Sequence, residues 1–419
     1  MTTIPNLPAA RPARQFDFAG SGRIHPLMQF SRASVGTCFG PDGLLRRVGS
    51  NVPRIDYDPE TGECLGLLFE ESETNLALQS EDFANAAWVK QRATIAAKVM
   101  LSPDGTAMAD ALVSDNQAAA EHGVSQLNMA ATFAQGDRFF FSVFVKPGQK
   151  SKVALRLRRS LSSGFVTGYF DLVTGETNVT GASQGATLSL QRKKLPNGWT
   201  WCCIEYFAGS TDGADPLVAY VYPADLMTST LYDGTGAQDL YLFGAQCTKR
   251  NWSSSYIATT TAQVTRAADV ASMAARDLGW VGQRGTMVAE ARMNLRFRAC
   301  MPFFLGPSVT FQNANCVSAW LSQSNNTELS SAAVYIKKAD VIYLGTSFGS
   351  APRAVWNKIG VAVDAGNFTS AFNGVLVNAT GELPAINFIS FGYQFTGHIR
   401  KIAFFAAAVT GPELGRLTA

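Results

Sequence analysis

Charge and helical periodicity are both scarce in this chain of 419 residues, and each shortage narrows the possible functions. Charged residues make up 16% of the sequence, whereas an average soluble domain has about 25%. The 35 basic and 32 acidic side chains leave a formal net charge of +3, which does not favour a nucleic-acid-binding surface. Because 47% of the residues are hydrophobic and 27 are phenylalanine, the chain is nevertheless predicted to fold around a large core.

Long apolar segments are also missing. The N-terminal stretch MTTIPNLPAARPARQFDF has no apolar region of the kind that a signal peptide needs. The longest late apolar run, 402–409, is far shorter than the roughly 20 residues of a membrane-spanning helix. The sequence therefore predicts a protein without membrane insertion.

Cysteine is present but shows no pattern of pairing. The seven cysteines are odd in number, are scattered, and include no C-x-x-C motif. They are Cys38, Cys64, Cys202, Cys203, Cys247, Cys300 and Cys316. We expect all seven to be reduced, mostly buried small hydrophobes of a protein made in a cytoplasm.

Enzyme motifs give no positive signal. The sequence has only three histidines and contains no H-E-x-x-H zinc motif, P-loop or dinucleotide fingerprint. The segment 181–185 matches G-x-S-x-G, but an alternating strand follows it where a nucleophile elbow needs a helix. We therefore predict no enzyme activity, no catalytic residue, no metal and no cofactor.

Two acidic segments resemble functional sites, but each also has a simpler structural interpretation. Residues 56–62 superficially resemble a calcium loop, but Thr61 stands where that loop needs glycine, so a hairpin turn is favoured. Glu70, Glu71 and Glu73 form the densest acidic cluster, and a glycosidase pair is one interpretation. A solvated strand end is the interpretation that we favour.

The recurring pattern is one of short alternating segments separated by Gly, Pro, Asn or Asp, which is typical of an all-β sandwich. About eight such segments lie between residues 81 and 260, the number found in a jelly roll. A second β-rich block begins near residue 280 and runs to the end. The predicted fold class is all-β, with two jelly-roll or β-sandwich domains. The predicted organisation is an extended N-terminal arm (1–27), a hairpin-rich connecting segment (28–80), a jelly roll (81–262), a linker (263–279) and a second β-sandwich (280–419).

Aromatic residues are the best candidates for ligand contact, because exposed rings on a β-sandwich can stack against sugar faces. Trp199 and Trp201 alternate along one predicted strand and should share a face, although burial in the core is the more common fate of such rings. Trp320 precedes a polar loop that contains Asn325, and Tyr393 with Gln394 lies in a glycine-flanked turn. Recognition usually occurs in loops, so the second sandwich is favoured over the first. The candidate ligand-binding residues are Trp320, Tyr393, Gln394, Asn325, Trp199 and Trp201.

Two sets of short sequence segments, here called phrases, are more specific indicators of the protein family than the composition is. The first set is SRASVGTCFGPDGLL (31–45), NVPRIDYDP (51–59), GLLFEE (66–71) and TNLALQSEDF (74–83), followed by Trp88. The second set is YLFGAQ (241–246), SYIAT (255–259) and VTRAAD (264–269). In this order they resemble a module of bacteriophage and prophage tail proteins, in which such phrases bracket a carbohydrate-binding-module-like jelly roll. The resemblance covers roughly residues 28–273.

The C-terminal block resembles a concanavalin/laminin-G-like sandwich more loosely, through the segment 395–405 and then Leu414. One departure from the tail-protein pattern lies at 247–249, which reads Cys-Thr-Lys where the family usually has Leu-Glu. This difference leaves the fold implied by the resemblance intact, but a shared acidic contact is not implied here.

The resemblance implies a virion component of a phage tail, such as a tail fibre or baseplate protein, that displays lectin-like sandwiches toward a host cell-surface glycan. The expected partners are this glycan and other tail or baseplate proteins, which the N-terminal arm would contact within a homotrimer assembled in the bacterial host cytoplasm. No nucleic acid is expected as a partner, and the family supplies no catalytic residues. Two alternatives stay open: a head-fibre or decoration protein, and a glycan depolymerase that uses acids such as Glu70, Glu71 or Glu290.

Overall fold

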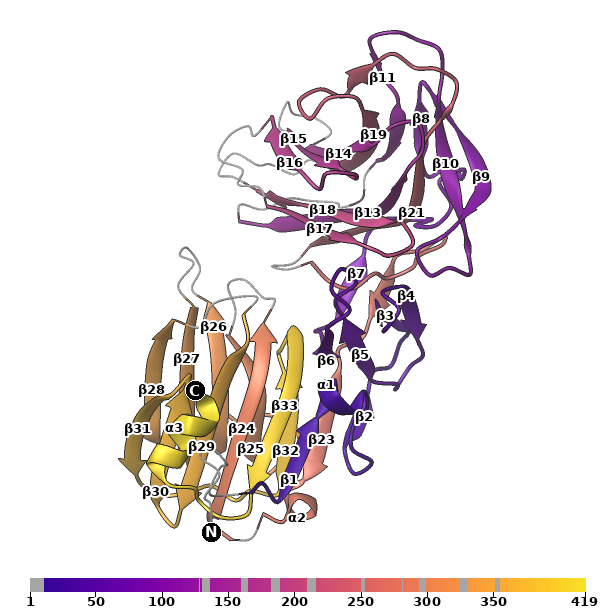
Figure 1. Cartoon of the computed structure of the whole chain (residues 1–419). Coiled ribbons are helices and arrows are strands. Elements are labelled where there is room, and N and C mark those ends of the chain that lie inside the picture. The colour runs from indigo at the N-terminus through magenta and orange to yellow at the C-terminus, as the bar shows by residue number, and fades with distance from the viewer. Residues whose placement is uncertain are drawn as a thin grey trace, which may run out of the picture.

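The computed structural model describes residues 11–127, 129, 136–159, 165–181, 189–208, 216–249, 253–280, 282–293, 299–323, 330–350 and 355–419. Within these ranges it contains 33 strands and three short helices. Figure 1 shows two β-sandwiches joined by a narrow connector built from early and middle parts of the chain. The predicted all-β fold class with two sandwiches is confirmed.

The first sandwich is a jelly roll of two six-stranded sheets, which we call the β13 sheet and the β14 sheet. In spatial order the β13 sheet contains β17 (Leu190–Lys194), β18 (Thr200–Phe207), β13 (Arg138–Pro147), β21 (Gln238–Lys249), β10 (Met108–Ser114) and β9 (Ala93–Leu101). The β14 sheet contains β16 (Thr177–Thr180), β15 (Phe165–Asp171), β14 (Lys152–Arg159), β19 (Leu217–Ala224), β12 (Gly123–Gln126) and β8 (Val89–Gln91). A small pair, β11 (Ala120–Glu121) and β20 (Leu231–Tyr232), lies beside them.

Alternation along the strands explains how the jelly roll packs. On β14, Val153, Leu155 and Leu157 enter the core between the two sheets, because side chains two residues apart share a face. On β18, Cys202 joins that core, whereas its neighbour Cys203 joins a second core on the opposite side of the β13 sheet. The β13 sheet is therefore covered on both faces.

The second sandwich also has two sheets, here called the β24 sheet and the β25 sheet. The β24 sheet contains β31 (Val375–Thr380), β30 (Asn367–Phe372), β29 (Asn357–Asp364), β24 (Arg284–Met293), β33 (Gly397–Phe405), β6 (Cys64–Phe69) and β5 (Arg54–Tyr57), and β1 (Arg14–Asp17) also pairs with β33. The β25 sheet contains β2 (Gln29–Ser31), β23 (Val270–Ala274), β32 (Phe388–Tyr393), β25 (Ala299–Gly306), β26 (Cys316–Gln323), β27 (Ser330–Lys338) and β28 (Val341–Ser350).

The prediction of an extended N-terminal arm is wrong for its described residues, 11–27. β1 pairs with β33, and α1 (Phe18–Ser21) follows it directly. Phe16 and Phe18 are 3% and 1% exposed and belong to the core of the second sandwich. A strand of four residues is too short to show a period, and its apolar partners come from the far end of the sequence.

The predicted linker also forms regular structure. β22 (Val264–Arg266) pairs with β7 (Glu73–Asn75), and β23 is an interior strand of the β25 sheet. α2 (Ala275–Leu278) follows β23. The β22–β7 pair, the hairpin of β3 (Gly36–Phe39) and β4 (Leu45–Val48) and the neighbouring β5–β6 hairpin make the connector visible in Figure 1, whereas α2 lies at the opposite end of the second sandwich. The final helix, α3 (Gly411–Thr418), begins at the N-cap Thr410, whose side chain accepts a hydrogen bond from the backbone N–H of Glu413.

All seven cysteines are unpaired, and six of them are buried. Burial raises the pKa of Cys38 to about 12, chiefly because the thiolate would lose its hydration. The interpretation of these residues as small buried hydrophobes is confirmed, with Cys64 as the partly exposed exception.

Candidate functional site

Five aromatic side chains gather on the outer face of the β25 sheet, and we call them the aromatic cluster: Phe304, Phe311, Trp320, Tyr335 and Tyr393. The core-facing residues of β26 are Val317, Ala319 and Leu321. The alternation of the strand therefore turns Trp320 to the opposite, outer face. Phe304 is buried, and the other four rings are partly exposed.

The rings of the cluster form a continuous series of contacts across the sheet. The Phe311 centroid lies 5.7 Å from that of Trp320 and 5.6 Å from that of Tyr393. Tyr335 lies 6.3 Å from Trp320 in an edge arrangement. The structure therefore joins Trp320 and Tyr393, which are separate candidates in the sequence, through Phe311, a residue that no sequence pattern marks.

A glycine explains why Tyr393 reaches the outer face. Phe391 faces the core, and a regular strand would turn Tyr393 the same way. Gly392 between them has a φ of 67°, a left-handed conformation that breaks the alternation. Tyr393 then contacts Phe304, with centroids 5.5 Å apart.

Polar groups border the cluster. The Trp320 Nε1 donates to the Ser318 Oγ at 2.7 Å, which leaves its ring fixed in orientation. The Lys337 ammonium donates to the Asn313 Oδ1 at 2.9 Å and lies 5.5 Å from the Tyr335 centroid. Gln394 is partly exposed beside Tyr393 and has a φ of 49°.

The remaining residues that the sequence suggested as ligand contacts lie outside this cluster. Trp199 and Trp201 do share a face, but both are packed into the second core of the β13 sheet, where Trp199 is fully buried and Trp201 is 8% exposed. The Trp199 Nε1 donates to the carbonyl of Leu101 at 3.0 Å. The proposal of a sugar platform formed by both rings is therefore corrected, because Trp199 has no exposed surface and only Trp201 reaches a cleft. Asn325 and most of the segment 181–185 lie outside the described residues.

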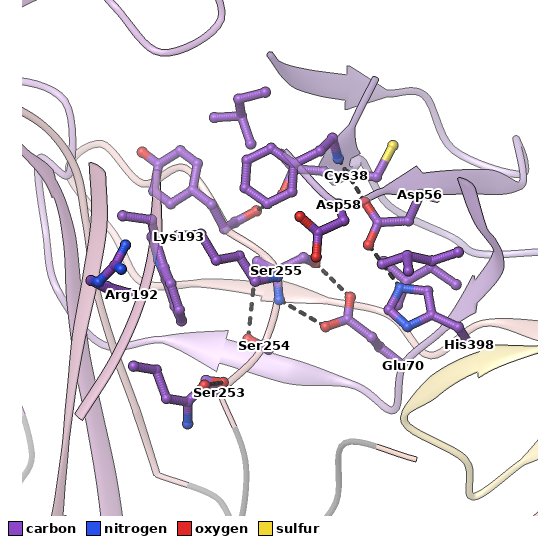
Figure 2. Close-up of a pocket in the computed structure, with 18 of the residues that line it drawn as sticks. Cys38, Asp56, Asp58, Glu70, Arg192, Lys193, Ser253, Ser254, Ser255 and His398 are labelled. Atoms are coloured by element: carbon purple, nitrogen blue, oxygen red, sulfur yellow. Dashed lines mark hydrogen bonds and ion pairs between the residues drawn. The ribbon is translucent and has the colours of Figure 1, made fainter. Parts of the chain in front are cut away.

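A separate cleft of about 470 Å³ lies where the jelly roll, the connector and the second sandwich meet. Figure 2 shows Arg192 and Lys193 from β17 on one side and His398 from β33 on the other, with connector carboxylates between them. The apolar wall of the cleft includes Phe39 and Trp201.

Two carboxylates that line the cleft are already committed to protein partners. The Asp56 carboxylate accepts hydrogen bonds from the His398 Nε2 at 2.8 Å and from the backbone N–H of Phe39 at 2.7 Å. Burial would raise the pKa of Asp56, but the hydrogen bond and the charge of His398 hold it below its ordinary value. Asp58 accepts from two backbone N–H groups in the β5–β6 turn, which confirms the predicted hairpin.

Glu70 is the third carboxylate of the cleft and is part of a buried charge network. Its carboxylate pairs with Arg54 at 2.6 Å and with Arg266 at 3.4 Å, and it accepts from the Ser255 Oγ at 2.5 Å. Burial would raise its pKa, but these partners hold the pKa at about 2. Glu70 is therefore ionised throughout the physiological pH range and cannot serve as a general acid.

The full network contains three arginines and three carboxylates, all buried: Arg32, Arg54, Arg266, Glu70, Asp269 and Glu73. Ion pairs join the first five, and Glu73 acts on the charge of Arg266, its register partner across the β22–β7 pair. All six lie within or beside the phrases that carry the phage-module resemblance. The interpretation of the acidic cluster as a solvated strand end is wrong for Glu70 and Glu73, because arginines distant in sequence meet them inside the connector. These phrases encode a junction between the sandwiches.

The described residues contain neither a metal-binding group of side chains nor a helix that could span a membrane. No group of three or more His, Cys, Asp or Glu side chains is placed to hold a metal ion. No helix in that part of the chain combines the length and hydrophobicity required to cross a bilayer.

Comparison with known protein families and with curated proteins yields no match for this chain. Among solved structures, the chain is similar to the CBM40 of the Ruminococcus gnavus IT-sialidase bound to α2,3-sialyllactose. The identity is 14%, 35% of this chain and 87% of that chain are covered, and the TM-score is 0.29. It is also similar to domain 4 of AbnA, a GH43 extracellular arabinanase from Geobacillus stearothermophilus, in complex with arabinotriose (17% identity, 36% and 73% coverage, TM-score 0.28). A third is the K499G mutant of the NanB sialidase of Streptococcus pneumoniae (17% identity, 34% and 26% coverage, TM-score 0.28).

Proposed function

We propose that this protein binds glycans without enzymatic activity, and that the aromatic cluster on the β25 sheet is the surface that contacts the sugar. The observation that supports the proposal is that Trp320 and Tyr393 both contact Phe311, so that the three rings form one partly exposed patch.

The chemistry of the patch suits a sugar. The C–H groups of a pyranose ring pack on an aromatic face, while its hydroxyls need hydrogen-bonding partners at the border. Gln394 and the Asn313–Lys337 pair provide amide and ammonium groups there. Four partly exposed rings lie together on this sheet face, and an apolar patch of this kind is typical of an interaction site.

The test uses Trp320→Ala and Tyr393→Ala in the full chain, assayed on an array of bacterial surface glycans and by attachment to host cells. We expect each variant to lose at least ten-fold in binding while its melting temperature stays near that of the wild type. Tyr241→Ala is the matched control, because Tyr241 is also partly exposed but lies on β21 of the jelly roll. Normal binding by both cluster variants would contradict the proposal.

If both variants unfold instead, the cluster is structural, since truncation of a core aromatic costs about 3–5 kcal/mol. A second pair, Lys337→Gln and Gln394→Ala, then separates the two explanations. These side chains border the rings and are not part of the core.

The biological setting that we propose is a bacteriophage tail, as a fibre or baseplate protein that forms a homotrimer and recognises a host-surface glycan. The support is the ordered set of phrases between residues 31 and 269. Avidity from several copies would offset a weak single-site affinity. Antibody labelling of purified particles in the electron microscope tests the position, and label on the head would favour the head-fibre alternative.

A glycan depolymerase is the remaining alternative, and the state of Glu70 disfavours one version of it. The arginine partners of Glu70 hold its pKa at about 2, so the acid of such an enzyme would have to be another residue. Incubation with host lipopolysaccharide or capsule, followed by an assay for new reducing ends, decides this point. Sustained product release would overturn the non-enzymatic proposal.

A further inference from the structure

The cleft between the jelly roll, the connector and the second sandwich, here called the junction cleft, contains cationic groups that, among the described residues, form no ion pair with its carboxylates. Arg292 on β24 lines the cleft, and its side chain has no hydrogen bond and no ion pair with any described residue. Its Nε is buried. An arginine presents five N–H donors, and burying such donors without acceptors is costly, so this side chain is suited to a ligand that supplies oxygen atoms.

The cross-strand neighbour of Arg292 gives an independent indication. His398 is the register partner of Arg292 across the β24–β33 pair, and its side chain is 5% exposed. Its Nε2 is held by Asp56, but its Nδ1 has no partner in the described part of the chain and is buried where the ring lines the cleft. Two adjacent side chains on one wall therefore have unused nitrogen atoms.

The opposite wall supplies a second cation. The Lys193 ammonium lies 5.2 Å from the Phe39 centroid and 5.8 Å from that of Trp201, and no carboxylate within the described ranges pairs with it. Arg192 beside it is occupied, because it pairs with Glu60 at 3.1 Å and donates to the carbonyl of Gly175.

The carboxylates of the cleft form no direct ion pair with Lys193 or Arg292 in the described part of the chain. Asp56 is bonded to His398 and Phe39, and Glu70 is paired with Arg54 and Arg266. Only Asp58 has an oxygen atom, Oδ2, without a partner in the described structure. An acceptor of this kind suits a sugar hydroxyl.

We propose that the junction cleft binds an acidic sugar residue, with the sugar carboxylate on Arg292 and the ring between the Phe39–Trp201 wall and Asp58. Arginine binds carboxylates in a two-pronged geometry that a neutral sugar cannot reproduce. A volume of about 470 Å³ lies within the range of small-ligand sites and fits a short saccharide. The cleft is separate from the aromatic cluster, so either site can fail alone.

The experiment titrates the full chain by calorimetry with glucuronic acid, glucose and inorganic phosphate. We expect glucuronic acid to bind at least ten-fold more tightly than glucose or phosphate, and the difference to shrink as salt is added. Arg292→Gln and Lys193→Gln should each weaken glucuronic acid binding at least ten-fold. Arg284→Gln is the matched control, because Arg284 is on the same strand but pairs with Asp364 on the surface.

Three results would overturn the proposal: glucose binding as tightly as glucuronic acid, phosphate binding as tightly, or full affinity in both Arg292→Gln and Lys193→Gln. If Arg292→Gln does not fold, Lys193→Gln decides, since Lys193 is partly exposed on the other wall. Trp320→Ala must leave the affinity for glucuronic acid unchanged. Loss of affinity in that variant would place the acidic sugar at the aromatic cluster instead.

Discussion

At the scale of single residues, the dominant feature is the set of six buried charges in the connector. Asp269 is central, because one of its oxygens accepts from Arg32 at 3.1 Å while the other accepts from Arg54 and from the backbone N–H of Glu70. Buried ion pairs add little stability over a well-packed apolar group, but breaking one leaves an uncompensated charge inside the protein. The network therefore makes the geometry of the connector sensitive to any single member.

The first prediction concerns Asp269→Asn. The substitution keeps the shape of the side chain but leaves three buried arginines facing two carboxylates, so we expect a loss of about 3–5 kcal/mol in the free energy of unfolding. Urea denaturation measures it. Asp42→Asn is the control, because Asp42 pairs with Arg46 on the surface at 42% side-chain exposure and should change stability by less than about 1 kcal/mol. Equal effects of the two substitutions would contradict this account.

The second prediction concerns acid. The pKa of Glu70 is held at about 2, below its ordinary value, so the unfolded chain binds a proton more readily than the native one. Its contribution to stability is complete above pH 4.5 and is lost as the pH falls toward 2, a total of about 3 kcal/mol. Urea melts at several pH values should show this decline. A Glu70→Gln variant should lack this part of the pH dependence, and an unchanged slope in that variant would refute the assignment.

At the scale of elements, the candidate site depends on breaks in regular strand geometry. Gly392 turns Tyr393 from the core side to the outer face of β32. A Cβ atom at position 392 would lie 2.2 Å from the Cδ1 of Phe69, a buried residue of the adjacent β6. The same glycine thus allows both the close approach of two sheets and the position of one ring of the aromatic cluster.

The third prediction compares Gly392→Ala with Gly62→Ala. Both glycines have positive φ, 67° and 74°, so both substitutions carry the cost of about 1–2 kcal/mol for a left-handed non-glycine residue. Only Gly392→Ala adds a clash, since a Cβ at position 62 meets no atom within 4 Å. We expect Gly392→Ala to be the more destabilising by about 1–3 kcal/mol in thermal unfolding. Equal melting temperatures would show that β32 relaxes around the added methyl group.

At the scale of the whole molecule, the second sandwich is assembled from both halves of the sequence. β1, β2 and β6 come from the first 69 residues, yet they pair with strands that begin at residue 270 or later, and β5 joins the same sheet through β6. The jelly roll is formed by the part of the chain between these two segments. The chain enters and leaves the jelly roll through the connector (Figure 1). The chain passes through the connector twice, and a buried charge network holds the connector together. Both features favour a fixed orientation of one sandwich relative to the other.

The fourth prediction follows from this assembly. Phe16→Ala and Phe18→Ala should each destabilise the second sandwich by about 3–5 kcal/mol, because both rings are buried in its core. Differential scanning calorimetry should show a lower transition for that sandwich. Leu27→Ala, at a side chain 46% exposed in the same N-terminal region, should have almost no effect. An unchanged transition in both phenylalanine variants would restore the interpretation of this region as an independent arm.

Several features could be predicted from the sequence because they depend on neighbours in the chain. Alternation placed Trp199 and Trp201 on one face, as the structure has them. The turn chemistry of 56–62 gave the β5–β6 hairpin. Alternation alone does not say whether a face is covered, which is why the tryptophan pair remained a candidate for ligand contact.

By itself, then, the sequence determined the all-β class, the two sandwiches and two members of the aromatic cluster, since these follow from local periodicity and composition. Only the tertiary structure decided the role of residues 11–30, the pairing of Glu70 with arginines, and the meeting of Lys193 and Arg292 in one cleft. The physical reason is the same in each case. Strand pairing and the burial of charge depend on partners that can lie hundreds of residues away, and a single sequence carries no period that marks such partners.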